Sequence, residues 1–121
     1  MKSEAMKNIR LTDEADLMLC TLYKAFKDNR ANGEDRYEAR IFGGSETLQI
    51  LYFQSWPIGD IDDIAWELSK NKLLTVNNGD NSVQDCALTT DAISYMEHRF
   101  GDKLEALLQR ITALRAFLLP L

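Results

Sequence analysis

Most of the information about the fold lies in residues 60–100, DIDDIAWELSKNKLLTVNNGDNSVQDCALTTDAISYMEHRF. In its first part, apolar side chains recur at i, i+3, i+4 and i+7, which is the spacing of one helix face. These side chains are Ile61, Ile64, Ala65 and Leu68. Asp60 stands just before them, where its carboxylate can cap the first turn. The pattern therefore predicts an amphipathic helix that begins at Asp60 and ends near Asn71.

A β-hairpin is predicted next, because two short apolar segments flank a dipeptide that favours a tight turn. The segments are residues 73–76 and 83–88, and the dipeptide is Asn78-Gly79. A second helix follows over 90–100 and is ended by a glycine. Its inward face is expected to carry Ala92, Ile93, Tyr95 and Met96.

The N-terminal part of the chain predicts two further helices joined by a short segment. Thr12 can cap the first helix, whose apolar spacing continues until residues 29–33. Segment 34–42 favours a helical turn, and Ser45 can cap a helix that extends to about residue 53. The side chains expected to face the core from the turn are Tyr37, Ile41 and Phe42.

Taken in order, these elements predict a winged helix-turn-helix domain, mainly α with a small β-hairpin. A length of 121 residues with 45% hydrophobic side chains suits one globular domain with its own core. No apolar run reaches the roughly 18 residues that a membrane span needs. We expect a flexible lead-in over 1–11, the winged-helix domain over 12–100 and a C-terminal helix over 101–121.

Three motifs frame the predicted hairpin and the helices beside it. They are Phe42-Gly43-Gly44-Ser45, Glu67-Leu68-Ser69-Lys70-Asn71-Lys72-Leu73-Leu74 and Leu88-Thr89-Thr90-Asp91-Ala92-Ile93-Ser94-Tyr95-Met96-Glu97. With them the chain resembles small winged-helix proteins of Gram-positive bacteria and their phages, in particular the group labelled YjcQ-like. The likeness extends over residues 12–100 and brings no catalytic residues with it. Related repressors place the helix before the wing in the DNA major groove and basic wing residues on phosphates, and this sequence departs from them at both places.

The outer face of the helix over 60–71 is the first candidate site. Opposite its apolar stripe it carries Asp62, Asp63, Trp66, Glu67 and Lys70. Three carboxylates against one ammonium oppose contact with DNA, whose binding depends on Lys and Arg. Residues 57–97 hold eight acidic side chains and two basic ones, a local charge of −6. The hairpin tip adds Asn77, Asn78, Asp80 and Asn81. A nucleic-acid partner is therefore disfavoured.

Trp66 is the residue of this face best suited to anchor a protein partner. Exposed tryptophan is enriched at protein interfaces, where a large ring with one hydrogen-bond donor is buried on binding. The alternative is that Trp66 packs under the hairpin or on the loop before its own helix.

The last helix is a candidate dimerisation element. Spacings of three and four alternate along it as in a heptad seam. The seam consists of Leu104, Leu107, Ile111, Leu114 and Leu118, with Leu108 beside it. In winged-helix dimers such a helix commonly pairs with its twin, as the resemblance implies, and the apolar ending over 116–121 favours a homodimer. The alternative is that the helix folds back onto the first helix of its own chain. A peripheral membrane contact is less favoured, because Arg110 and Arg115 provide little basic support.

No enzymatic site is indicated by the sequence. His98 is the only histidine, and no serine or cysteine has a plausible base near it. Cys20 and Cys86 fall in apolar patterns without zinc-ligand spacing, and we expect reduced thiols in a cytoplasmic protein. The aspartates over 60–63 are interpreted as a helix cap and first-turn acids, so no metal or cofactor is expected.

These patterns together predict a non-enzymatic interaction or regulatory module that acts through protein–protein contacts as a homodimer. The alternative is a DNA-binding transcriptional regulator that uses basic residues away from the acidic face. Those residues are Lys24, Lys27, Arg30, Arg36 and Arg40.

Overall fold

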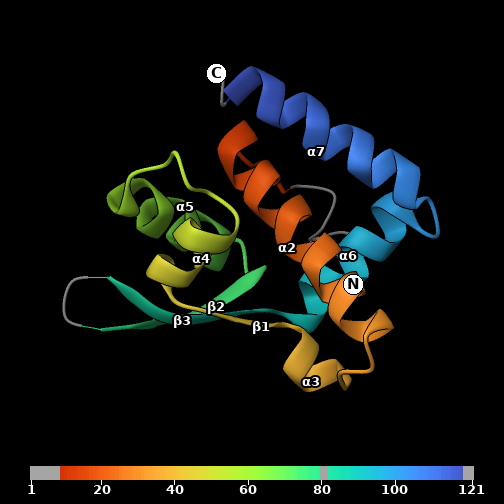
Figure 1. The fold of residues 1–121 in the computed structure, drawn as a ribbon, viewed down its shortest axis with the longest axis horizontal. Helices are drawn as coiled ribbons and strands as arrows, with labels where there is room; N and C mark the ends of the chain where they lie inside the picture. Colours follow the sequence, from red (N-terminus) through yellow and green to blue (C-terminus); the bar gives the residue numbers. More distant parts are fainter. Residues whose placement is uncertain (1–8, 80–81, 119–121) are drawn as a thin grey trace.

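The computed structural model describes residues 9–79 and 82–118, which form a mainly helical fold with a small three-stranded antiparallel sheet (Figure 1). Its elements are α2 (Asp13–Ala31), α3 (Arg36–Ala39), β1 (Ile41–Gly43), α4 (Ser45–Leu51), α5 (Ile58–Lys70), β2 (Leu74–Asn78), β3 (Val83–Leu88), α6 (Thr90–Phe100) and α7 (Leu104–Leu118). The predicted hairpin and the helix over 90–100 are confirmed. The lead-in before residue 9, the hairpin-tip residues Asp80 and Asn81, and the chain after Leu118 lie outside the described residues.

Helix α2 is central to the packing. All residues from 15 to 23 are buried, so α2 is covered around most of its circumference. Its neighbours are α3, α5, α6 and α7, and Figure 1 shows α7 along one edge of the molecule beside α2. The helix begins as predicted, because the Thr12 hydroxyl accepts a hydrogen bond from the Ala15 N–H at 3.2 Å.

The sheet has one strand more than the predicted hairpin. Strands β2 and β3 pair antiparallel with Thr75 opposite Ala87, and β1 pairs with the other edge of β3. Segment 34–42 was expected to be a helical turn. Only its earlier part is helical, as α3, and its end forms the beginning of β1. With three residues and an irregular register, β1 is too short to show the alternation that identifies a strand.

The expectation that Tyr37 faces the core is wrong. Its side chain is 65% exposed, whereas Ala39 is the buried residue of α3. A single helical turn has room for one inward position, and alanine occupies it here. The Tyr37 ring lies instead under the Arg40 guanidinium, 5.2 Å from the ring centroid.

Two helices begin at other residues than predicted. Helix α5 begins at Ile58 with Pro57 in the cap position, and Asp60 lies inside its first turn. Proline suits this position, because its fixed φ fits the extended cap residue and the N–H that it lacks would have no helical partner. Helix α4 begins at Ser45 with Gly44 as its cap, where a Cβ would stand 2.6 Å from the Val83 carbonyl oxygen. Only glycine allows the chain to pass β3 so closely.

Candidate functional site

The predicted partner-binding face of α5 is divided by the structure. Asp62, at one edge of this face, is bonded within the chain. Its Oδ1 atom accepts hydrogen bonds from the Ser45 hydroxyl and, at 3.0 Å, from the Val83 N–H. Because Ser45 begins α4 and Val83 begins β3, one carboxylate links three elements. This explains why Asp62 is needed by the fold.

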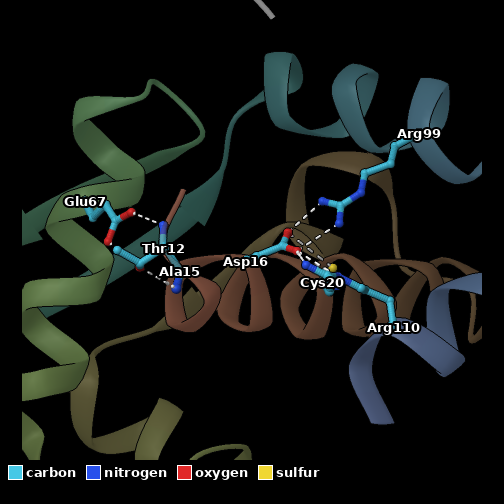
Figure 2. Close-up of polar contacts among 7 residues, drawn as sticks. All are labelled: Thr12, Ala15, Asp16, Cys20, Glu67, Arg99 and Arg110. Carbon is cyan, nitrogen blue, oxygen red and sulfur yellow. Dashed lines mark hydrogen bonds and ion pairs between the residues drawn. The ribbon is translucent and has the colours of Figure 1, made fainter. Parts of the chain in front are cut away.

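Glu67, at the other edge of the face, is also bonded within the chain. Its two carboxylate oxygens accept hydrogen bonds from the N–H and the hydroxyl of Thr12, both at 2.8 Å (Figure 2). Thr12 caps α2, so Glu67 fixes the beginning of α2 against α5. A role in the fold therefore accounts for this residue too.

The other three predicted residues form an exposed ridge along α5. Asp63, Trp66 and Lys70 follow one another at helical spacing, and we call them the α5 ridge. The Trp66 side chain is 37% exposed, whereas Trp56 is only 7% exposed. Asp63 and Lys70 have opposite charges, so the ridge itself is neutral. The carboxylates of Asp62 and Glu67, which are hydrogen-bonded within the chain, lie at its two edges. The ridge is less acidic than the predicted five-residue face.

Helix α7 packs against the chain's own core. Leu107, Ile111 and Leu114 are buried there, and α7 lies in contact with α2. Leu118 is partly buried, whereas Leu104 and Leu108 are 45% and 38% exposed. This arrangement corresponds to the predicted alternative, in which the last helix folds back onto the first helix of its own chain. The buried side chains would reach a second copy only if α7 left α2, so a homodimer through this seam stays a prediction.

A buried ion-pair cluster joins three helices at a place that the sequence analysis did not identify (Figure 2). Asp16 on α2 is 6% exposed. The Arg99 guanidinium from α6 donates to both its carboxylate oxygens, at 2.6 and 2.8 Å. The Arg110 guanidinium from α7 donates twice to Oδ2, at 3.0 and 2.9 Å. We call these three residues the Asp16 clamp.

The charge states in the clamp follow from its geometry. Burial would raise the pKa of the Asp16 carboxyl, but the hydrogen bonds and positive charges of Arg99 and then Arg110 outweigh it and hold that pKa below its usual value. Hydrogen bonding to Asp16 raises the pKa of Arg99 further, against the effect of burial. The carboxylate therefore stays ionised and accepts from two guanidinium groups, an arrangement suited to holding helices rather than to moving protons.

The sequence did contain a signal for this clamp. Asp16 precedes Cys20 by four residues and Tyr23 by seven, so it lies on the same face as two core positions of α2. It also stands in the first turn of α2, where an acid suits the positive end of the helix dipole. A carboxylate on a buried face requires a cationic partner, and the arginines on the last two helices were among the candidates.

The two thiols are unsuited to catalysis. Cys20 and Cys86 are free and buried. Burial, followed by the negative charge of Asp16, raises the pKa of Cys20 to about 12, and burial with Asp85 raises the pKa of Cys86 to about 12. Both remain protonated at neutral pH and behave as core side chains.

Within residues 9–79 and 82–118, no three His, Cys, Asp or Glu side chains converge so that they could hold a metal ion. In the same part of the chain, no helix has the length and apolar character required to cross a bilayer.

Comparison with known proteins adds no relative on which a function could rest. No family model, no curated protein and no solved structure matches this chain.

Proposed function

We propose that this chain is a winged helix-turn-helix module that acts without catalysis by binding a protein partner through the α5 ridge. The element order supports the fold assignment. Helix α2 is followed by β1, by the helix pair α4 and α5, and by the hairpin of β2 and β3. The hairpin follows α5 in the chain, and the sheet order β1-β3-β2 supports assigning it as the wing of such a domain.

The observation that carries the binding proposal is the exposure of Trp66. More than a third of this large side chain contacts solvent, on a helix whose opposite side is buried. Tryptophan contributes strongly to protein interfaces, because its ring loses much apolar surface to the partner and its N–H can still donate. Asp63 and Lys70 lie one turn away on either side and can fix the orientation of a partner with complementary charges.

Four of the five basic residues that could support the alternative, DNA binding, have partners within the chain. Lys24 pairs with Asp28 at 2.6 Å, and Lys27 lies over the Tyr23 ring. Arg30 donates to the Glu34 carbonyl at 3.2 Å, and Arg40 donates to the Leu88 carbonyl at 2.9 Å. Groups that already have partners are less available to phosphates, which favours a protein partner.

Affinity capture with three forms of the protein tests this proposal. The wild type, Trp66→Ala and the control Tyr37→Ala are immobilised and exposed to extract of the source cells. Tyr37 is a second exposed aromatic residue, far from α5 in sequence and 65% exposed. We expect at least one protein that the wild type and Tyr37→Ala retain and that Trp66→Ala loses.

The captured protein is then purified and titrated against the free chain while tryptophan fluorescence is followed. Binding at the ridge should protect Trp66 from a soluble quencher, and the Trp66→Phe variant, which keeps the buried Trp56, should show no such change. A retained set that is the same for wild type and Trp66→Ala would overturn the proposal.

A further inference from the structure

A small cavity lies against the Asp16 clamp, where α2, α6 and α7 meet. Its volume is about 140 Å³, and it is partly open to solvent. A cavity of roughly 150 Å³ holds a benzene molecule, so there is room here for an organic molecule of about six to eight non-hydrogen atoms. The lining includes all three clamp residues, Tyr95 from α6 and Asp13 from the first turn of α2.

The clamp leaves hydrogen-bond donors unused at this cavity. Arg99 donates to Asp16 through its two terminal nitrogens, and Arg110 donates through Nε and one terminal nitrogen. Within residues 9–79 and 82–118, no hydrogen bond engages the Arg99 Nε, the Arg110 Nη1 or the Tyr95 hydroxyl. Two guanidinium groups share one carboxylate in the clamp, which leaves one positive charge in excess (Figure 2). Such a group of donors suits a carboxylate.

Asp13 brings a negative charge to the same cavity. Its side chain is exposed, and no ion pair or hydrogen bond joins its carboxylate to another described residue. With Asp13 and Asp16 set against the two arginines, the charges of the lining sum to zero. A free anion would be attracted by the clamp and repelled by Asp13. A molecule that carries an ammonium group as well as a carboxylate satisfies both.

The remaining lining is apolar. Ile9 and Leu11 stand just before α2, and both are partly buried against the core. The surface that they leave at the cavity can be covered by an apolar group of a ligand, which is favourable in proportion to the area removed from water.

We propose that this cavity binds a free α-amino acid with a small apolar side chain. The ligand carboxylate accepts hydrogen bonds from the clamp arginines and the Tyr95 hydroxyl. Its ammonium group donates to Asp13, and its side chain contacts Ile9 and Leu11. Each charged group of the ligand thus meets a group of the protein that has no other described partner at that atom. None of the described lining residues comes from α5, so this proposal can fail while the proposed function holds, and the reverse.

Three matched ligands test which charges the cavity requires. Isothermal titration calorimetry of the full chain is carried out with L-valine, with 3-methylbutanoate, which lacks the ammonium group, and with 2-methylpropylamine, which lacks the carboxylate. We expect L-valine to bind at millimolar concentration. Each analogue should bind at least about tenfold more weakly, because it leaves one charged group of the cavity unpaired.

Asp13→Asn reverses the preference between two of these ligands. It keeps the shape of the side chain and removes its charge, so it should weaken binding of L-valine by about tenfold and strengthen binding of 3-methylbutanoate. Glu14→Gln is the matched control, because it removes a neighbouring exposed acid that does not line the cavity, and it should change neither affinity. Circular dichroism checks that both variants fold.

Tyr95→Phe tests the carboxylate end of the cavity without disturbing the clamp. It removes one hydroxyl and should weaken binding of L-valine and of 3-methylbutanoate by the same factor, about fivefold. The proposal is overturned if the wild type does not bind L-valine at millimolar concentration, or binds 3-methylbutanoate or 2-methylpropylamine as tightly. It is also overturned if Asp13→Asn leaves the affinity for L-valine unchanged.

Discussion

The side chain of Asp16 connects three helices. Its carboxylate on α2 accepts from Arg99 of α6 and Arg110 of α7. In Asp16→Asn the amide cannot neutralise the two guanidinium groups, and the two arginine side chains are 26% and 41% exposed, so water continues to screen part of their charge. We expect the free energy of unfolding to fall by about 2–3 kcal/mol, somewhat below the loss for a fully buried pair. Urea unfolding measures this loss of unfolding free energy. The control is Asp13→Asn, which changes an exposed acid of the same first turn and should lower the unfolding free energy by less than about 1 kcal/mol.

The contribution of Asp16 should also depend on pH. Its pKa is lowered in the folded state from an ordinary value of 3.8. A group with a depressed folded pKa stabilises the protein above its unfolded pKa, and this stabilisation disappears as the pH falls through the folded pKa. The difference in unfolding free energy between the wild type and Asp16→Asn should be constant above about pH 5 and shrink steadily as pH falls below 3.8. A difference that grew toward acid pH would contradict this assignment.

Some local features of single residues were predictable from the sequence, whereas long-range partners were not. The cap at Thr12 and the helix end at Gly101 depend on neighbours within one turn, and both are as expected. Asp62 and Glu67 were assigned to a free surface because helical spacing shows only which side of a helix they occupy. Their partners lie 17 to 55 residues away in sequence, and no local pattern encodes such a separation.

At the scale of elements, α7 shows what a heptad pattern does and does not specify. The spacing correctly identifies Leu107, Ile111 and Leu114 as buried, but the same stripe fits a second copy or the chain's own α2. Contacts at the end of the helix support the second arrangement. The Arg115 guanidinium donates to the Tyr52 carbonyl at 2.9 Å, so α7 is also held to the connection after α4.

Packing of α7 within one chain gives a testable difference between two adjacent leucines. Leu107→Ala should lower the unfolding free energy by about 3 kcal/mol, because it removes a buried side chain and leaves a cavity. Leu108→Ala, at a position that is 38% exposed, should change it by less than about 1 kcal/mol. Urea unfolding at several protein concentrations measures both changes. An effect of Leu107→Ala that appeared only at high concentration would show that α7 pairs between copies.

Over the whole molecule, charge sets the strongest constraint on partners. The net charge is −5, and eight acidic side chains fall between residues 57 and 97. Two of them, Asp62 and Glu67, are bonded within the fold, so reversing them would damage the structure before it tested any surface. Asp63 is the one acid of the α5 ridge, which makes it the suitable position for a charge reversal.

DNA binding can therefore be tested with one substitution. The wild type is titrated into a labelled mixed-sequence DNA duplex while fluorescence anisotropy is followed. At physiological salt we expect no binding with a dissociation constant below about 10⁻⁴ M, the weak limit of ordinary non-specific binding. Asp63→Lys makes the ridge basic and should add affinity that falls steeply with salt, because each phosphate contact releases counterions. Glu105→Lys makes the same charge change at an exposed position of α7, and it should add less affinity for DNA, since it lies away from the ridge. Clear binding by the wild type, altered in sequence preference by Asp63→Lys, would instead establish α5 as a DNA-reading helix and make a transcriptional regulator the better assignment.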